Sequence, residues 1–358
     1  MDRKDLREEE GAGCRTDLKG PPMKEAMLYQ KLSGQKVHCQ LCNHRCQIGE
    51  DKRGICGVRE NRGGTLYTLV YRQLISRNVD PIEKKPMFHF APGSRSFSIA
   101  TVGCNFHCDF CQNYEISQMP RDQKRILGED VSPEEIVALA KRAGCKTIAY
   151  TYTEPTIYFE YAYDIARRAT QEGLKNIFVT NGYMTEEALR TIHPHLHGAN
   201  VDLKAFTEEF YQKRCGARLE GVLHSLRVMK ELGVWVEVTT LIIPGLNDGA
   251  EELRNLAEFL VSLGPETPWH ISRFHPMYKM LDRSPTSVRI LEQARKIGVE
   301  SGLRYVYTGN VPGDDGEDTY CHHCGKLLVD RLGFQILKYQ VKEKKCYNCG
   351  SPIDGVDL

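Results

Sequence analysis

The chain has 358 residues, of which 48 are lysine or arginine and 47 are aspartate or glutamate, so its formal net charge is +1. This balance gives no support for a polyanion-binding surface, and nucleic acid is not expected as a partner. The first ten residues are too charged for a signal peptide, and no apolar run approaches the ~18 residues that cross a bilayer. We therefore expect a cytoplasmic protein with one large catalytic domain and small appendages.

Fourteen cysteines are many for such a chain, and most of them fall into groups. Close C-x2-C and C-x3-C pairs in a cytosolic chain favour metal binding over disulfide bonds. Three cysteines stand apart and are expected to be small buried side chains or solvated thiols: Cys14, Cys145 and Cys215. The groups are Cys39, Cys42, Cys46 and Cys56, then Cys104, Cys108 and Cys111, and finally Cys321, Cys324, Cys346 and Cys349.

Residues 1–36 show no periodic pattern and mix charges with glycine and proline, which predicts a disordered tail with one short helix at 23–32. Residues 37–63 form a small module whose four cysteines follow the spacing C-x2-C-x3-C-x9-C. Such a module buries too little apolar surface to fold unaided, so metal ligation is the natural source of its stability. Zinc and an iron–sulfur cluster both fit, and four unligated thiols are the alternative. His38 and His44 are expected to be neighbours rather than ligands, because four cysteines suffice.

Residues 64–312 alternate between apolar runs and amphipathic helical patterns. Strands are predicted at Phe97–Val102, Thr147–Tyr150, Asn176–Val179, Gly198–Leu203, Trp235–Leu241, Trp269–Phe274 and Arg304–Val306. Helices are predicted at Pro133–Ala143 with Ser132 as N-cap, Ile157–Gln171, Thr185–Thr191, Leu219–Leu232, Ala250–Leu263 and Ser287–Ser301. Six or seven such units predict an α/β fold with a parallel sheet, as a partial or full TIM-like (β/α) barrel.

Three cysteines follow the first of these strands directly, in the spacing C-x3-C-x2-C. Cys104, Cys108 and Cys111 can therefore surround one point at the carboxyl end of a strand, where α/β proteins place their chemistry. Three thiolates are one short of the four that close an iron–sulfur cluster or a structural zinc site, so the set favours a metal centre with an open position. A zinc site completed by His107 and a redox-inert group of thiols are the alternatives.

Polar residues also follow the next strands of the sheet. Glu154 comes after the second strand, where its carboxylate could accept hydrogen bonds from an ammonium group or could cap the following helix. Thr180 and Asn181 come after the third strand, in a Thr-Asn-Gly sequence that is also a turn signal.

The fourth strand delivers Asp202 and Lys204, which alternation places on the same face. They could form an internal salt bridge or bind the hydroxyl and carboxylate groups of a zwitterionic cofactor. His275 follows the sixth strand, and both a structural and a functional role are open for it.

Residues 313–358 carry two C-x2-C knuckles, and each is followed by a glycine. Short strands are predicted between them at 327–329 and 334–339. Cys321, Cys324, Cys346 and Cys349 therefore predict a zinc-ribbon module with a structural zinc. Ribbons of this kind can bind nucleic acid, but the neutral charge balance gives no support for that role here.

The segment from Cys104 to Cys111 resembles the signature of radical S-adenosylmethionine (SAM) enzymes, in which an aromatic residue precedes the last cysteine as Phe110 does. The resemblance implies a [4Fe-4S] cluster whose open iron binds SAM, and an electron donor such as ferredoxin or flavodoxin. Reduction would then cleave SAM to a 5′-deoxyadenosyl radical. In glycyl-radical activases, the positions of Glu154, Thr180, Asn181, Asp202, Lys204 and His275 border SAM, although the glycines before Glu154 are absent.

The chain from about residue 37 onward is also similar to the AmmeMemoRadiSam system radical SAM enzymes. This likeness rests on the Cys39–Cys42 segment, the Cys104 motif, Asp202-Leu-Lys204, Tyr307–Asn310 and the terminal ribbon. It implies Memo-like and AMMECR-like proteins as partners. We expect an oxidoreductase- or transferase-type enzyme whose radical abstracts hydrogen from an unidentified substrate. The alternatives are an activase that forms a glycyl radical on a protein, and an iron–sulfur electron carrier or zinc-dependent binding module.

Overall fold

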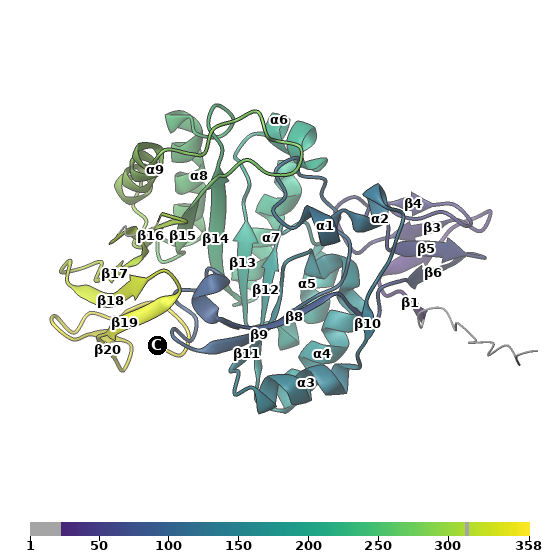
Figure 1. The fold of residues 1–358 in the computed structure, drawn as a ribbon, viewed down its shortest axis with the longest axis horizontal. Coiled ribbons are helices and arrows are strands. Elements are labelled where there is room, and N and C mark those ends of the chain that lie inside the picture. The colour runs from purple at the N-terminus through teal and green to yellow at the C-terminus, as the bar shows by residue number, and fades with distance from the viewer. Residues whose placement is uncertain (1–22, 312–314) are drawn as a thin grey trace, which may run out of the picture.

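The computed structural model of the chain describes residues 23–311 and 315–358. An eight-stranded sheet lies at its centre, and helices cover it (Figure 1). Its parallel strands are β9 (Arg95–Ala100), β11 (Thr147–Tyr150), β12 (Lys175–Thr180), β13 (Gly198–Asp202), β14 (Trp235–Ile242), β15 (Trp269–Arg273) and β16 (Val306–Gly309). They pair in chain order and run parallel, so the carboxyl ends of all these strands lie on the same side of the molecule.

The sheet is open. Strand β8 (Ser76–Pro81) pairs antiparallel with β9 and forms one edge, and β16 forms the other. The predicted α/β fold with a parallel sheet is confirmed, whereas the pairing shows no closed barrel. The antiparallel edge strand was not predicted, because Ser76–Pro81 carries mainly polar residues and ends at a proline.

Helices connect the parallel strands, and all six predicted helices are present. They are α3 (Pro133–Arg142), α4 (Phe159–Gln171), α5 (Glu186–Ile192), α7 (Leu219–Glu231), α8 (Ala250–Leu263) and α9 (Val288–Glu300). Ser132 caps α3 as predicted: its hydroxyl accepts a hydrogen bond from the amide of Glu135 at 3.2 Å, and the Glu135 carboxylate accepts one from the amide of Ser132 at 2.8 Å. Three short helices were not predicted, namely α1 (Tyr114–Ser117), α2 (Met119–Asp122) and α6 (Glu208–Phe210).

The N-terminal segment corrects the prediction of a helix within a disordered tail. Strand β1 (Lys24–Glu25) pairs with β6 (Thr65–Thr68), and β2 (Tyr29–Lys31) pairs with β3 (Val37–Cys39). The amide of Met27 between them donates to the carboxylate of Glu160 at 2.6 Å. Pairing with distant strands thus outweighs local helix propensity, and residues 23–36 belong to the fold. The remainder of the expected tail, with Cys14, lies outside the described residues.

The four-cysteine module contains β3, β4 (Gln47–Ile48), β5 (Arg59–Arg62) and β6, arranged in two three-stranded sheets that include β1 and β2. It lies at one end of the molecule's long axis, and the C-terminal module lies at the other (Figure 1). The C-terminal strands are β17 (Thr319–Tyr320), β18 (Leu327–Leu332), β19 (Gln335–Tyr339), β20 (Val341–Lys342) and β21 (Lys345–Cys346). Two short strands, β7 (Gln73–Leu74) and β10 (Glu129–Asp130), pair beside the main sheet.

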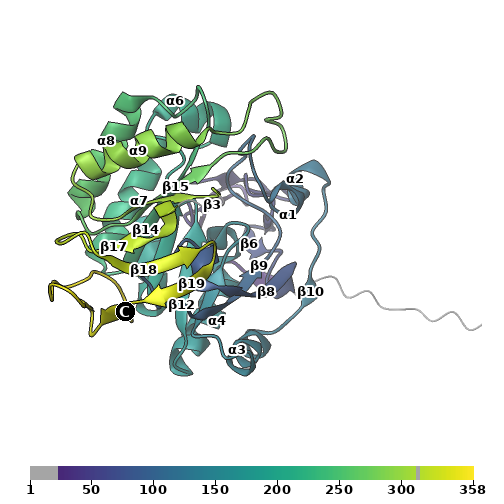
Figure 2. The ribbon, with the colours of Figure 1, turned by 60° about the vertical axis from the view of Figure 1, so that its left-hand side comes forward.

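The C-terminal module packs near the amino ends of the parallel strands, where β14 begins (Figure 2). There the buried carboxylate of Glu237 accepts hydrogen bonds from the amides of Phe88 and His89 and from the ring of His270. Arg331 of β18 donates to the carbonyl of Phe88 at 3.1 Å and stacks over its ring. These contacts attach the module to the end of the sheet opposite the Cys104 loop.

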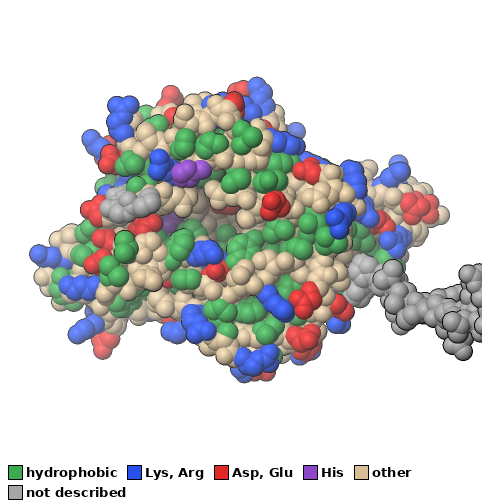
Figure 3. Space-filling view, in the orientation of Figure 1, with side chains coloured by type: hydrophobic (Ala, Val, Ile, Leu, Met, Phe, Trp, Pro, Cys, Tyr) green, Lys and Arg blue, Asp and Glu red, His purple; other side chains and the backbone are tan. Residues whose placement is uncertain are grey.

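Lysine and arginine side chains are interspersed with aspartate and glutamate on the face drawn in Figure 3. This mixture agrees with the formal net charge of +1. Among the described residues, none of the helices has both the length and the apolar character needed to span a membrane.

Candidate active site

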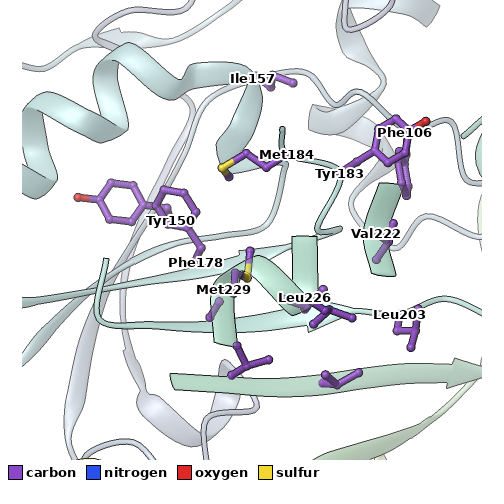
Figure 4. Packing of buried hydrophobic residues seen from close by; sticks show 14 of the residues in the cluster. Phe106, Tyr150, Ile157, Phe178, Tyr183, Met184, Leu203, Val222, Leu226 and Met229 are labelled. Atoms are coloured by element: carbon purple, nitrogen blue, oxygen red, sulfur yellow. The ribbon is translucent and has the colours of Figure 1, made fainter. Parts of the chain in front are cut away.

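The three central cysteines lie in the loop that leaves the carboxyl end of β9. Gly103 precedes the first of them with φ of +108°, and a Cβ there would lie 2.9 Å from Cγ1 of Val58. Only glycine therefore fits at this position without displacing the N-terminal module. Phe106 anchors the loop, since its ring contacts Tyr183 at 5.2 Å between centroids (Figure 4).

Each sulfur of the loop has its own polar neighbours. The sulfur of Cys104 accepts a hydrogen bond from the amide of Phe106 at 3.3 Å, and the sulfur of Cys111 lies 3.2 Å from the hydroxyl of Ser117. Burial raises the pKa of Cys104 well above its ordinary value. The pKa of Cys108 is lowered instead, first because the Cys215 side chain hydrogen bonds to it. Hydrogen-bonding groups of the protein thus already lie beside each of the three sulfurs.

The structure does not support the alternative zinc site with His107 as fourth ligand. Within the described residues, the only group of three or more His, Cys, Asp or Glu side chains close enough to hold one ion is in the C-terminal module. His107 turns toward Gly216, and its Cδ2 lies 3.1 Å from the position that a Cβ would occupy on that glycine. Burial also lowers the pKa of His107 to about 4. Among the described residues, these side chains are thus not arranged as a ready four-ligand site for one ion.

Glu154, Thr180 and Asn181 come together in one buried network beside Cys104. One carboxylate oxygen of Glu154 accepts hydrogen bonds from the hydroxyl of Thr180 at 2.7 Å and from both the amide and hydroxyl of Thr156. The other oxygen accepts from the amide of Asn181 at 2.8 Å. Burial raises the pKa of Glu154, and these donors oppose that rise. The helix-capping role considered for Glu154 is thus present, and it fixes the carboxylate next to the loop.

Asp202 and Lys204 share a face after β13, as alternation predicts. Their charged groups form a salt bridge of 2.7 Å between Oδ2 and Nζ. Burial disfavours the ammonium, but the charges of Asp202 and Cys108 together raise the pKa of Lys204. The internal salt bridge considered from the sequence is therefore real. The charge of Lys204 also contributes to the lowered pKa of Cys108, after the hydrogen bond from the Cys215 side chain and against burial.

His275 lies just beyond the carboxyl end of β15, and its side chain is exposed. In the described part of the chain, no hydrogen bond or ion pair joins it to Glu154 or Asp202. The loop that follows His275 reaches the cysteine loop, since the amide of Lys279 donates to the carbonyl of Asp109 at 2.9 Å. Tyr278 stacks on Tyr114 at 4.6 Å between centroids. This loop closes one side of the site.

Two residues at the site were missed from the sequence. Asn105 is fully buried, and its side-chain oxygen accepts a hydrogen bond from Asn181 at 2.7 Å. Its Nδ2 has no hydrogen-bond partner among the described residues, as expected of a donor that faces a ligand. Cys215, which hydrogen bonds to Cys108, belongs to no cysteine pattern. Asn105 could have been found from its place between Cys104 and Cys108 in the sequence, but Cys215 could not.

The other two cysteine groups also assemble. In the C-terminal module the sulfurs of Cys321 and Cys349 lie 3.7 Å apart, as do those of Cys324 and Cys346. A tetrahedral zinc site with Zn–S bonds of about 2.3 Å has sulfur–sulfur edges of about 3.8 Å, so this spacing suits one ion. In the N-terminal module, Cys39, Cys42, Cys46 and Cys56 line one cavity.

Comparisons with known proteins agree with this site. Residues 98–260 match the family model described as the Radical SAM superfamily. The chain is 47% identical to an uncharacterized protein of Methanocaldococcus jannaschii, over 93% of this chain and 99% of that protein. It is 31% identical to the GTP 3′,8-cyclase of Aquifex aeolicus, over 46% of this chain and 52% of the cyclase.

Two further matches are more distant. The pyruvate formate-lyase-activating enzyme of Clostridium pasteurianum is 23% identical, over 48% of this chain and 71% of the activating enzyme. The crystal structure of a radical SAM methyltransferase from Sphaerobacter thermophilus superposes with a TM-score of 0.50 and 16% identity. It covers 86% of this chain and 81% of the methyltransferase, which shows a shared fold.

Proposed function

Because the chain belongs to the radical SAM superfamily, we propose that Cys104, Cys108 and Cys111 hold a [4Fe-4S] cluster whose open iron binds SAM. When bound and reduced, such a cluster supplies the electron that splits SAM into methionine and a 5′-deoxyadenosyl radical, which abstracts hydrogen from a substrate. The observation that carries the proposal is the set of three free thiols, one buried and two partly buried, in the loop at the carboxyl ends of the parallel strands. Three ligands leave one position open, and the network of Glu154, Thr180 and Asn181 lies beside it.

The chain's own residues would position SAM rather than perform chemistry. The carboxylate of Glu154 suits the ammonium group of SAM, and the fixed Asn181 and Thr180 hold that carboxylate in place. Asp202 and Lys204 offer one charge of each sign to the ribose hydroxyls and the carboxylate of SAM. His275, on the exposed rim, would close over the cofactor, and the Tyr278 loop would exclude water.

The test is release of 5′-deoxyadenosine. Anaerobically reconstituted protein with dithionite and SAM should release it, and Cys108→Ala should release none while the terminal metal stays bound. Cys145→Ala is the matched control, because Cys145 is equally buried but lies outside the three groups. Absence of 5′-deoxyadenosine from protein that holds an intact cluster and binds SAM would refute the radical reaction and favour an electron carrier.

The substrate class stays open between a small molecule and a protein. The cyclase of Aquifex aeolicus is named for a nucleotide substrate, whereas the enzyme of Clostridium pasteurianum activates another protein. We rank the small molecule first, because the glycines expected before Glu154 in activases are absent. A partner protein that gains a stable radical during turnover would reverse this order.

The finer assignment is to the AmmeMemoRadiSam system, which would make Memo-like and AMMECR-like proteins its partners and ferredoxin or flavodoxin its electron donor. The presence of both cysteine modules on one chain supports this assignment. The sulfur spacing in the C-terminal module supports a structural zinc there. A reducing cytoplasm would suit the described cysteines, all of which are free thiols. Co-purification with tagged Memo-like and AMMECR-like proteins tests the partners.

A further inference from the structure

Four cysteines of the N-terminal module surround a cavity that no part of the proposed reaction uses. Cys39, Cys42, Cys46 and Cys56 line it, and its volume is about 20 Å³. That space holds about one water-sized particle, which needs about 10–15 Å³, so the volume itself does not separate one ion from a cluster. Apolar side chains, including Ile48 and Ile157, form much of the remaining wall. The cavity is therefore lined by thiols and apolar side chains, with Arg59 and Thr156 as its other polar residues.

The spacing of the sulfurs separates this cavity from a single-ion site. The C-terminal group brings its sulfurs to 3.7 Å, the edge of a tetrahedron around one zinc ion. In residues 23–311 and 315–358, the four N-terminal cysteines are not among the groups close enough to hold one ion. A four-iron cluster spreads its thiolates over the corners of a larger core than one ion. The same chain thus builds one compact and one wide four-cysteine site.

A buried arginine on the cavity wall points to the charge of the occupant. Arg59 is only 2% exposed, and its Nη2 donates to Oε1 of Glu160 at 2.8 Å and to the carbonyl of Met27 at 2.7 Å. Its Nε and Nη1 have no hydrogen-bond partner among the described residues. Buried donors without partners are costly, so an anionic occupant with sulfur acceptors would satisfy a need that the protein leaves open.

The cavity also abuts the Cys104 loop. The carbonyl oxygen of Cys56 lies 3.5 Å from the position that a Cβ of Gly103 would occupy. His44 hydrogen bonds to the carbonyl of Asn105 at 2.8 Å, within the loop itself. The N-terminal module is therefore in direct contact with the Cys104 loop at these two places. A redox-active group in the cavity would sit beside the proposed SAM cluster, whereas zinc there would be electronically inert.

We propose that Cys39, Cys42, Cys46 and Cys56 ligate a second iron–sulfur cluster, with Arg59 as its buried counter-charge. This assignment is independent of SAM cleavage, because it concerns a different set of ligands. It predicts that the N-terminal module binds iron and that the C-terminal module binds zinc.

Metal and sulfide analysis of the full-length protein, reconstituted anaerobically with iron and sulfide, tests the assignment. The wild type should hold about eight irons and about one zinc per chain. A Cys104→Ala, Cys108→Ala, Cys111→Ala variant should keep about four irons, with the Mössbauer spectrum of a four-iron cluster, although it cleaves no SAM. About two zincs in the wild type, or loss of all iron from this variant, would overturn the proposal.

The reciprocal variant keeps the two proposals distinguishable. Cys42→Ala with Cys46→Ala should also keep about four irons, now those of the Cys104 loop, and should still bind SAM. Cys145→Ala should keep the full iron content as the matched control. If the reciprocal variant retains every iron, the N-terminal cysteines are not ligands and the assignment fails even where SAM cleavage stands.

The reduction potential of the proposed cluster tests the role of Arg59, because a purely structural residue would not change it. In the variant that lacks Cys104, Cys108 and Cys111, Glu160→Gln removes a negative charge near the cavity and should raise the reduction potential. Arg59→Met removes the positive charge and should lower it, because a cation favours the more negative reduced cluster. Unchanged potentials in both variants would refute the role of Arg59. If Arg59→Met does not fold, Arg59→Gln takes its place, and an unchanged potential in that variant refutes the role of Arg59 in the same way.

Discussion

Replacement of Glu154 by glutamine separates two roles of this buried carboxylate: it stabilises the fold as a hydrogen-bond acceptor, and we propose that it binds the ammonium group of SAM. One oxygen of Glu154 accepts from Thr156 and Thr180, and the other accepts from the amide of Asn181 at 2.8 Å. A glutamine side chain has only one oxygen, so its NH2 group must face donors on one side. The least costly orientation keeps the oxygen toward the threonines and turns the NH2 toward Asn181.

The cost follows from that orientation. The amide of Asn181 would be buried without a partner, which costs about 1–3 kcal/mol, and the remaining bonds would lose their charge assistance. We therefore expect E154Q to lower the free energy of unfolding by about 2–4 kcal/mol. A charge-assisted bond to the SAM ammonium is worth about 1.5–3 kcal/mol, so SAM affinity should fall about 10- to 150-fold.

Glu237 provides the matched control, because it is a buried carboxylate in the same sheet that also accepts backbone amides. It lies at the opposite edge, so E237Q should cost comparable stability and leave SAM affinity unchanged. Thermal unfolding and anaerobic titration calorimetry with SAM measure the two effects. Equal loss of SAM affinity in E154Q and E237Q would show a general loss of structure. Wild-type SAM affinity in E154Q would refute the binding role of Glu154.

The remaining predictions concern other parts of the chain. Burial works against the charge of Glu237, but His270 and the other donors lower its pKa, so its contribution is full above about pH 4.3 and is lost as pH falls through the lowered folded value. The difference in free energy of unfolding between wild type and E237Q, measured by urea unfolding, should therefore stay constant from about pH 6 to 8 and shrink below about pH 4. A difference that becomes larger below about pH 4 would contradict a lowered pKa of Glu237. D202N should leave Lys204 without its 2.7 Å partner and slow 5′-deoxyadenosine release at limiting SAM about tenfold, with iron content unchanged. Chelation of the C-terminal metal should lower the unfolding temperature but not the initial rate of SAM cleavage; a parallel loss of rate would place the ribbon in the reaction. G103A should cost about 1–3 kcal/mol and lower the iron content, because its Cβ would meet Val58; wild-type loading would show that the loop tolerates the shift.

The strongly periodic part of the chain could be predicted well. The strand at 147–150 and the helix at 250–263 coincide with β11 and α8. Both combine an unbroken apolar pattern with clear ends, so local sequence and tertiary packing favour the same structure. The last strand shows where this agreement ends: it was predicted at 304–306 but runs over Val306–Gly309. Its register is fixed by pairing with β15, which the segment's own pattern does not contain.

The candidate site divides in the same way. Cysteine spacing identified the central loop, and alternation placed Asp202 and Lys204 on one face, where the structure shows their salt bridge. The spacing of residues in the sequence does not predict contacts between distant segments. Cys215 meets Cys108 only because the π-helical turn Tyr211–Cys215 folds over the loop, and its backbone carbonyl accepts from the amide of His107 at 2.8 Å. A lone cysteine has no local signal for such a position.

The N-terminal strands explain why the four-cysteine module could be recognised but not placed. Its spacing predicts a set of metal ligands, yet the position of these cysteines depends on Arg59, whose partner Glu160 lies in α4. A buried ion pair contributes little net stability because desolvation offsets the attraction, but breaking it leaves an uncompensated charge. The pair therefore holds the module in one orientation against α4, with Cys56 beside Gly103. Because Arg59 has donors to spare, the same residue that docks the module also places positive charge on the wall of the cavity.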